Sequence, residues 1–180
     1  MSLLSPVGYF NMHKNIAHIQ LVLKDHIRDV KGEKVVESAR KYLGIDTGRV
    51  KSAQIFSVLY DLSAQAVRDF ANLCLKDEIV NDVYINTFYS NPGYEAYIMV
   101  AKLPGVTDDE GTSAQKTLAD FLNIPLDTNT QHIFTKEVYL IEKSLERNQL
   151  KMIAEELLGN KLIHHFEYGY LSPSPSPKVR

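Results

Sequence analysis

The sequence lacks the features that mark a secreted, membrane-bound or nucleic-acid-binding protein. Cys74 is the only cysteine in 180 residues, so no disulfide can form within the chain, and the composition leans towards a reducing compartment. The net charge of −2 provides no electrostatic signal for nucleic acid or an anionic membrane. No run approaches the roughly 20 apolar residues of a membrane-spanning helix, and the first residues lack the pattern of a signal peptide. We therefore expect a cytoplasmic protein.

Motifs for catalysis or metal binding are also missing. None of the six histidines is in a His-x-x-x-His arrangement, and we interpret them as surface or edge residues. His164 and His165 would face opposite sides of a strand. Cys74 falls on the inward face of a predicted helix, which favours a buried, unreactive thiol. The turn at residues 103–111 lacks a Gly-x-Gly-x-x-Gly pattern, and acids crowd the helix start where a phosphate would bind. We therefore predict no catalytic, cofactor-binding or metal-binding residue.

The chain does contain an internal repeat. Residues 18–24, with a helical stretch that ends at Gly44, recur 79 residues later as residues 97–102 and a stretch that ends at Asn123. Residues 55–58 and 74–80 recur at an offset of 83, so the second copy has four extra residues, which fall between residues 125 and 137. A shift confined to a polar stretch is typical of a loop insertion. Two copies of this length indicate a duplicated half-domain and not a solenoid.

Each copy has the pattern β-α-β-α-β. Alternating apolar residues predict strands at residues 17–24, 51–60, 79–85, 94–103, 132–142 and 162–168. Helical spacing predicts helices at residues 29–43, around 67–74, 108–122 and 146–158, with Tyr42, Cys74 and Phe121 among the inward positions. One copy alone would bury a marginal core. The predicted fold class is α+β: two tandem βαβαβ repeats form a pseudo-two-fold domain, with helices covering the faces of antiparallel sheets that lie side by side or face to face.

The predicted organisation has five parts. Residues 1–15 form a flexible N-terminal extension, 16–86 the first repeat, 87–93 a linker with an Asn-Pro-Gly turn, and 94–170 the second repeat. Residues 171–180 form a Ser/Pro-rich tail or linker, because alternating prolines prevent a helix or a strand ladder. A longer polypeptide could continue from this segment.

The two copies share a cap at the start of their first helix. Asp29 and Asp108 are placed as N-caps, whose carboxylates accept from backbone N–H groups, and we expect Asp108→Ala to cost about 1 kcal/mol. Pro104 and Gly105 shape the preceding turn in the second copy, where the first copy has Asp25 and His26. This turn is therefore predicted to be structural.

The second copy carries a recognisable pattern. Residues 102–111 read Lys-x-Pro-Gly-Val-x-Asp-x-x-Gly, and residues 158–163 read Leu-x-Asn-x-x-Ile. This pattern resembles the PurS family, the small subunit of phosphoribosylformylglycinamidine synthase. Two copies in tandem resemble the PurS-like N-terminal region of single-chain forms of that enzyme, in which a fused pair stands in for a dimer. The resemblance covers residues 16–168; the first copy keeps Asp29 and Gly32 but lacks the Pro-Gly.

The resemblance implies a non-catalytic, structural role in purine biosynthesis. The complete synthase is a carbon–nitrogen ligase that uses ATP, Mg²⁺ and glutamine to convert formylglycinamide ribonucleotide to formylglycinamidine ribonucleotide. This chain would bind none of these cofactors. Its partners would be the synthetase and glutaminase domains or subunits, with no nucleic acid and no membrane. The motif residues would be structural: Asp29, Gly32, Pro104, Gly105, Asp108, Gly111 and Asn160.

Two functions of other classes compete with this interpretation. Tandem ferredoxin-like α+β units often bind ligands between copies, which would make the chain a small-molecule-binding regulatory module. A small enzyme with a site between the copies is a third possibility.

Overall fold

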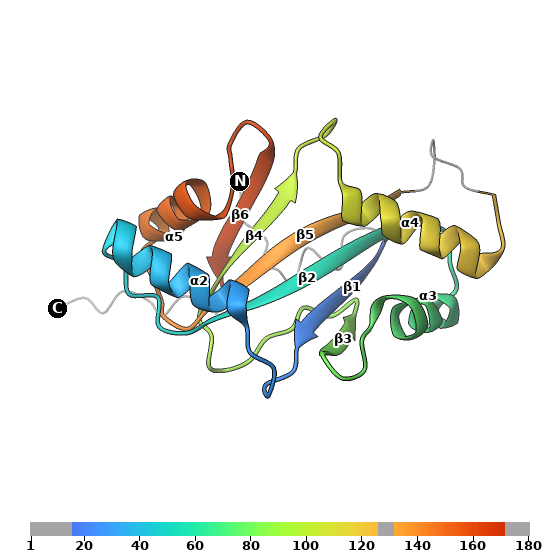
Figure 1. Cartoon of the computed structure of the whole chain (residues 1–180), viewed down its shortest axis with the longest axis horizontal. Coiled ribbons are helices and arrows are strands. Elements are labelled where there is room, and N and C mark those ends of the chain that lie inside the picture. Colours follow the sequence, from blue (N-terminus) through green and yellow to red (C-terminus); the bar gives the residue numbers. More distant parts are fainter. Residues whose placement is uncertain (1–15, 126–131, 172–180) are drawn as a thin grey trace.

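The computed structural model describes residues 16–125 and 132–171, which form one six-stranded antiparallel sheet with helices packed on it (Figure 1). The α+β class and the antiparallel pairing are therefore confirmed. The strands are β1 (Ile16–Leu23), β2 (Val50–Leu59), β3 (Asn81–Ile85), β4 (Ala96–Lys102), β5 (His132–Ile141) and β6 (His164–Tyr170). The helices are α2 (Val30–Ser38), α3 (Ala64–Phe70), α4 (Asp109–Leu122) and α5 (Arg147–Ile153), and α2, α3 and α5 continue as the π-helical turns η1 (Ala39–Leu43), η2 (Ala71–Leu75) and η3 (Ala154–Leu158).

The strand order is symmetric about the centre of the sheet. It runs β3-β1-β2-β5-β4-β6, so the first half (residues 16–85) and the second half (residues 96–170) each contribute three adjacent strands in the same relative order. At the centre, Gln54 of β2 pairs with Glu137 of β5. These two residues are 83 positions apart, which makes them equivalent positions in the two halves. The order of the strands is therefore the same in both halves when read outward from this central pair, and the halves lie side by side in one sheet.

The helices lie on one face of the sheet, whereas both faces were expected to be covered by helices. Alternate residues of β2, Val50, Phe56 and Val58, point into the two clusters that contain the helices. The opposite face carries a separate cluster, in which Ile55 packs with Phe88 and other residues of the connection between the halves. Central strands with apolar residues on both faces need cover on both sides, and this connection supplies part of it.

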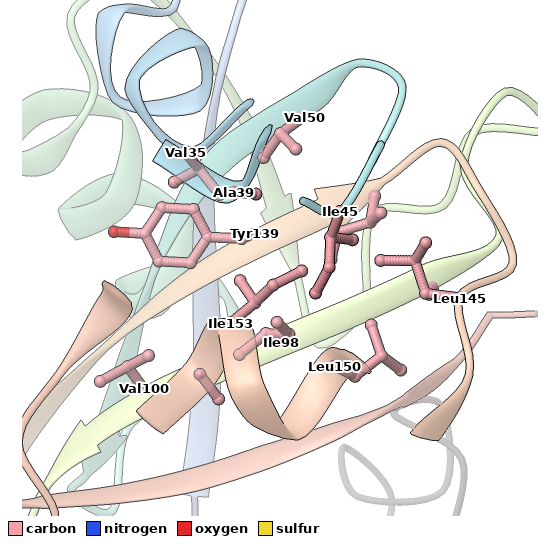
Figure 2. Close-up of a cluster of buried hydrophobic side chains, with 13 residues drawn as sticks. Val35, Ala39, Ile45, Val50, Ile98, Val100, Tyr139, Leu145, Leu150 and Ile153 are labelled. Carbon is pink, nitrogen blue, oxygen red and sulfur yellow. The ribbon is translucent and has the colours of Figure 1, made fainter. Parts of the chain in front are cut away.

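Each helix-side cluster contains residues from both halves. Figure 2 shows the first of them. The first cluster joins Ala39 after α2 to Ile153 of α5 over Tyr139 of β5. The second joins Phe70 of α3 to Leu118 of α4. Full burial of each large apolar side chain contributes about 1.5–3 kcal/mol. Separation of the halves would therefore expose part of both clusters.

The expectations for Tyr42, Phe121 and His18 were wrong. Phe121, predicted to face inward, is 37% exposed. Tyr42, predicted to face inward, is 66% exposed. It lies in the π-helical turn η1, where i→i+5 bonding shifts residues away from the face that a period of 3.6 predicts. Cys74 of η2 faces the second helix-side cluster as predicted, although it is only half-buried. His18 is not a surface histidine but is buried in the sheet, with Nδ1 3.0 Å from the hydroxyl of Ser57.

Some expected segments fall outside the described residues. They are the N-terminal extension, most of the Ser/Pro-rich tail and most of the loop insertion. On the near side of the insertion, Gly44 and Asn123 are both left-handed helix caps and are 79 residues apart. On its far side, the paired residues Gln54 and Glu137 are 83 apart. No helix within the described ranges is long and apolar enough to cross a membrane.

Candidate functional site

The two N-cap aspartates tie a helix to a strand. Asp29 accepts hydrogen bonds from the Gly32 N–H at 2.8 Å and from both the backbone N–H and the hydroxyl of Ser52 on β2. Asp108 accepts from the Gly111 N–H at 2.9 Å and from the N–H and hydroxyl of Thr135 on β5. The capping was predicted, but the bonds to the strands were not. Ser52 and Thr135 occupy equivalent positions in the two halves, and both carry a hydroxyl group. The recurrence of a hydroxyl residue at this position was the signal in the sequence for these bonds.

The glycines of the same motif allow close packing of helix on strand. A Cβ atom on Gly32 would lie 2.3 Å from the carbonyl oxygen of Val50, and one on Gly111 would lie 2.4 Å from that of Ile133. Neither position therefore accommodates a side chain without a shift of the backbone. The Asp-x-x-Gly motif in each half joins the first turn of a helix to the start of a central strand.

The remaining motif residues shape turns. Gly105 has a φ of +85° after Pro104, which is the pattern of a type II turn, while the equivalent His26 has no positive φ. The Asn160 side chain accepts from the Leu162 N–H at 2.9 Å, in the turn before β6. Asp77 does the same for Ile79 before β3, at 2.8 Å. The structure thus places every motif residue at a turn or a helix start and does not bring them together into one site.

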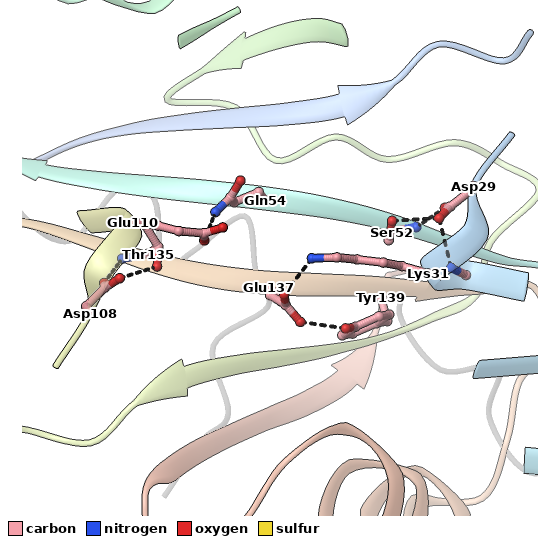
Figure 3. A network of polar contacts seen from close by, with 10 residues as sticks. Asp29, Lys31, Ser52, Gln54, Asp108, Glu110, Thr135, Glu137 and Tyr139 are labelled. Carbon is pink, nitrogen blue, oxygen red and sulfur yellow. Dashed lines mark hydrogen bonds and ion pairs between the residues drawn. The ribbon is translucent and has the colours of Figure 1, made fainter. Parts of the chain in front are cut away.

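A polar network surrounds the central Gln54–Glu137 pair (Figure 3). The Lys31 ammonium forms an ion pair of 2.7 Å with Glu137, and the Gln54 amide donates to Glu110. Lys31 and Glu110 occupy equivalent positions in the two halves, as do Gln54 and Glu137. The network therefore joins α2 to the strand of the second half and α4 to the strand of the first. Sequence reasoning missed it because each pair is far apart in the chain.

The pKa values of Glu137 and Tyr139 in this network are shifted in opposite directions. Burial acts to raise the pKa of Glu137, but hydrogen bonds from Lys31 and from the Tyr139 hydroxyl outweigh it and lower the pKa below its usual value. Burial, followed by the bond to Glu137, raises the pKa of Tyr139 well above its usual range. Glu137 is therefore ionised and Tyr139 protonated near neutral pH. This arrangement suits a structural contact and not proton transfer, which needs a pKa near the operating pH.

Two clefts occupy equivalent positions at opposite ends of the central strands. The first cleft has a volume of about 1010 Å³ and lies beside α2, the turn at residues 24–27 and the start of β2. The second cleft has a volume of about 760 Å³ and lies beside the turn at residues 103–106 and the start of β5. Asp29 lines the first cleft and its equivalent Asp108 lines the second. Both are large enough for a small molecule.

The clefts differ in the residues at equivalent positions. Arg49 and Lys51 line the first cleft, where the second has His132 and Phe134 at the equivalent positions. The Lys51 side chain is 11% exposed, forms an ion pair of 2.5 Å with Asp25, and has its ammonium 5.6 Å from the centre of the Tyr89 ring. Burial acts to lower the pKa of Lys51, but Asp25 and the nearby tyrosines together outweigh it, so the pKa is raised. Lys51 is therefore a charged group held inside the first cleft.

Within the described part of the chain, the cysteine and histidines do not form a reactive centre. Burial raises the pKa of the Cys74 thiol, which disfavours the nucleophilic thiolate. The His164 ring accepts a hydrogen bond from the Asn160 N–H at 3.0 Å, and burial followed by the charge of Lys102 lowers its pKa. Among residues 16–125 and 132–171, no group of three or more His, Cys, Asp or Glu side chains is placed to hold a metal ion.

Comparison with known proteins adds no relative to this picture. No protein-family model matches the chain, and no curated protein matches it significantly. Its function is therefore argued from the sequence pattern and the geometry above.

Proposed function

We propose that this chain is the non-catalytic, PurS-like bridging part of phosphoribosylformylglycinamidine synthase, where it couples the glutaminase to the synthetase. The observation that carries the proposal is the symmetric sheet, with equivalent Asp-x-x-Gly motifs around the Gln54–Glu137 pair. A fused pair of PurS-like units needs two halves with the same strand order and the same helix-to-strand contacts. Both requirements agree with the geometry described.

Residue-by-residue equivalence supports an origin as tandem repeats. Asp29 and Asp108 bond the same three types of donor, and a helix cap in the left-handed region ends the first helix of each half. Asp77 and Asn160 each hold the turn before an edge strand. Independent half-domains with a similar outline would have no reason to match at this level of detail. We therefore propose that residues 16–86 and 94–170 are two copies of one βαβαβ unit.

The candidate bridging surfaces lie at the two edges of the sheet. β3 and β6 are the edge strands and lie on opposite sides of the molecule (Figure 1). Before β3, Ile79 is 74% exposed, and before β6 its equivalent Leu162 is 82% exposed. Exposed apolar side chains beside open strand edges are typical of protein contacts. Two such edges suit a part that contacts two partners, each through an interface of at least about 1,000 Å².

The proposed mechanism is positioning. The chain would hold the glutaminase and the synthetase in a relation that lets ammonia pass without escaping to water. ATP, Mg²⁺ and glutamine would bind to the partners. The polar network around the Gln54–Glu137 pair supports this role, because its contacts join the two halves of the sheet. A sheet whose halves are joined in this way keeps its two edges at a constant separation.

Complementation of a truncated synthase tests this function. A synthetase that lacks its PurS-like region should regain glutamine-dependent synthesis when this chain is added. Ile79→Asp and Leu162→Asp should weaken the rescue, whereas Val30→Asp, a matched change at an exposed apolar residue of α2, should not. The bridging role is wrong if the truncated enzyme uses glutamine equally well without the chain.

One observation favours a second function, a small-molecule-binding regulatory module of the ferredoxin-like type. The first cleft, of about 1010 Å³, contains a sequestered ammonium group and is large enough for a small molecule. Calorimetry of the isolated chain with amino acids and nucleotides separates the two functions. A regulatory module would bind a ligand without its partners, and that ligand would change the rate of a partner enzyme.

A further inference from the structure

The first cleft contains a charged group with unusual surroundings. Lys51 extends from the central strand β2 onto the face of the sheet opposite the helices, and its side chain is only 11% exposed. Lysine side chains are seldom this buried, and a buried ammonium needs a charged or hydrogen-bonding partner. The rings of Tyr89 and Tyr94 lie around it, but a ring provides less stabilisation than an anion. Whether the first cleft can bind another anion therefore depends on the counter-ion of Lys51.

That counter-ion is an exposed acid on a turn. Asp25 lies between β1 and α2, and its side chain is 89% exposed although it contacts Lys51 at 2.5 Å. Within the part of the chain that the structure describes, its carboxylate has no other hydrogen bond. A carboxylate in this position can rotate into water at little cost, because water replaces its one bond. The ammonium group thus has a partner that another anion can displace.

The other charges of the first cleft favour an added anion. The Asp29 carboxylate accepts hydrogen bonds from Gly32 and Ser52, and Glu33 forms an ion pair with Arg28. Arg40 and Lys41 also line the cleft, and in residues 16–125 and 132–171 neither forms an ion pair. The lining acids that form no ion pair in those residues are Asp29, whose carboxylate oxygens already accept hydrogen bonds, and Glu37. Cations available to a ligand therefore outnumber available acids.

We propose that the first cleft binds a small phosphate monoester, whose phosphate replaces the Asp25 carboxylate on Lys51. A free carboxylate would exchange one monoanion for another and gain no charge. A phosphate group carries a charge of about −1.5 to −2 and three acceptor oxygens, so it is a stronger partner for the ammonium than the Asp25 carboxylate. The cavity of about 1010 Å³ leaves room for the rest of the metabolite. This proposal does not depend on the bridging function.

The second cleft provides an internal comparison. At the positions equivalent to Lys51 and Asp25 it has Phe134 and Pro104. At the positions equivalent to Arg40 and Lys41 the chain has Ala119 and Asp120. Lys102 and Lys136 line the second cleft, but neither is buried, and the counterparts of Arg40 and Lys41 are absent. The second cleft therefore lacks a sequestered ammonium group, and we expect the chain to bind one phosphate group per molecule.

Calorimetry of the full chain with ribose 5-phosphate, inorganic phosphate and ribose tests the proposal. Ribose 5-phosphate should bind saturably at one site, and ribose should not bind. Lys51→Gln should weaken binding about tenfold or more, because it removes a charge-assisted hydrogen bond. Asp25→Asn should tighten binding about threefold or more, because it removes the competing anion while leaving the ammonium in place. A purely structural ion pair would not produce opposite effects from its two partners.

The control is Lys143→Gln, which removes the same charge from the surface ion pair with Asp46, outside the cleft. It should leave the affinity unchanged. The proposal is overturned if wild type shows no saturable binding, if Asp25→Asn weakens binding, or if Lys143→Gln costs as much affinity as Lys51→Gln. Thermal unfolding of each variant establishes that it is folded; if Lys51→Gln does not fold, the direction of the Asp25→Asn effect decides.

Discussion

The two halves of the sheet share their backbone contacts but differ in the residues that line their clefts. Asp29 and Asp108 make the same bonds, whereas Lys51 of the first half corresponds to Phe134 of the second. The contacts that match join a helix to a central strand and are buried. The positions that differ line open clefts. Packing constraints hold the first group in both halves, while positions that line a cleft are free to acquire a different chemistry.

The largest expected effect comes from the aspartates at the equivalent helix starts. Asp108→Ala should lower the free energy of unfolding by about 3 kcal/mol, because it removes an N-cap and also the acceptor for the part-buried Thr135 N–H. This value replaces the 1 kcal/mol expected from capping alone. Asp29→Ala should cost a similar amount. Chemical denaturation measures both.

The control for these variants is Asp109→Ala, which removes an exposed acid from the first turn of α4 and should cost less than about 1 kcal/mol. A large cost at Asp108 with none at Asp29 would break the equivalence of the halves.

The glycines of the same motif are expected to have the next largest effect. Gly32→Ala and Gly111→Ala should each cost about 2 to 3 kcal/mol, because the new Cβ would lie within 2.4 Å of a strand carbonyl oxygen. Gly93→Ala is the matched control, since its nearest contact is a side-chain atom 3.3 Å away. Equal stability of Gly32→Ala and Gly93→Ala in thermal unfolding would contradict the close helix-to-strand packing.

Disruption of the polar network around the Gln54–Glu137 pair should have a smaller, pH-dependent effect on the free energy of unfolding. Lys31→Gln should lower the free energy of unfolding by about 0.5 kcal/mol at pH 7, as for other exposed ion pairs. The pKa of Glu137 is lower in the folded protein than its usual 4.5. The difference between wild type and variant is therefore fully present above that value and disappears as the pH falls through the folded-state pKa.

Lys34→Gln provides the control for this measurement, because Lys34 lies on the same helix and forms no ion pair within the described ranges. A Lys31→Gln effect that persists unchanged at pH 2 would show that the contact acts through packing and not through charge.

The smallest effect is expected from placing the lysine of the first cleft in the second. Phe134 is 50% exposed, so Phe134→Lys should change the free energy of unfolding by no more than about 0.5 kcal/mol. Calorimetry should show no second phosphate site, because the cations equivalent to Arg40 and Lys41 are absent there. A second site of equal affinity would show that position 51 alone decides the chemistry of a cleft.

Local features of this protein were predictable from the sequence. Alternation and helical spacing predicted all six strands and the four helices to within a few residues at most boundaries. The caps at Asp29 and Asp108 follow from residue type and position, because a short acceptor side chain before a helix has few other uses. These signals are local: each depends on residues within one or two turns of each other.

The tertiary structure alone decided how these elements meet. The sequence left open whether the sheets lie side by side or face to face. In the structure β2 pairs with β5, with Gln54 opposite Glu137, so the two halves form one continuous sheet. It also decided that helices cover one face, that Ser52 and Thr135 bond the caps, and that Lys51 is sequestered beside Asp25. Each of these contacts joins residues distant in the chain, and its free energy depends on burial and geometry that exist only once the sheet has formed.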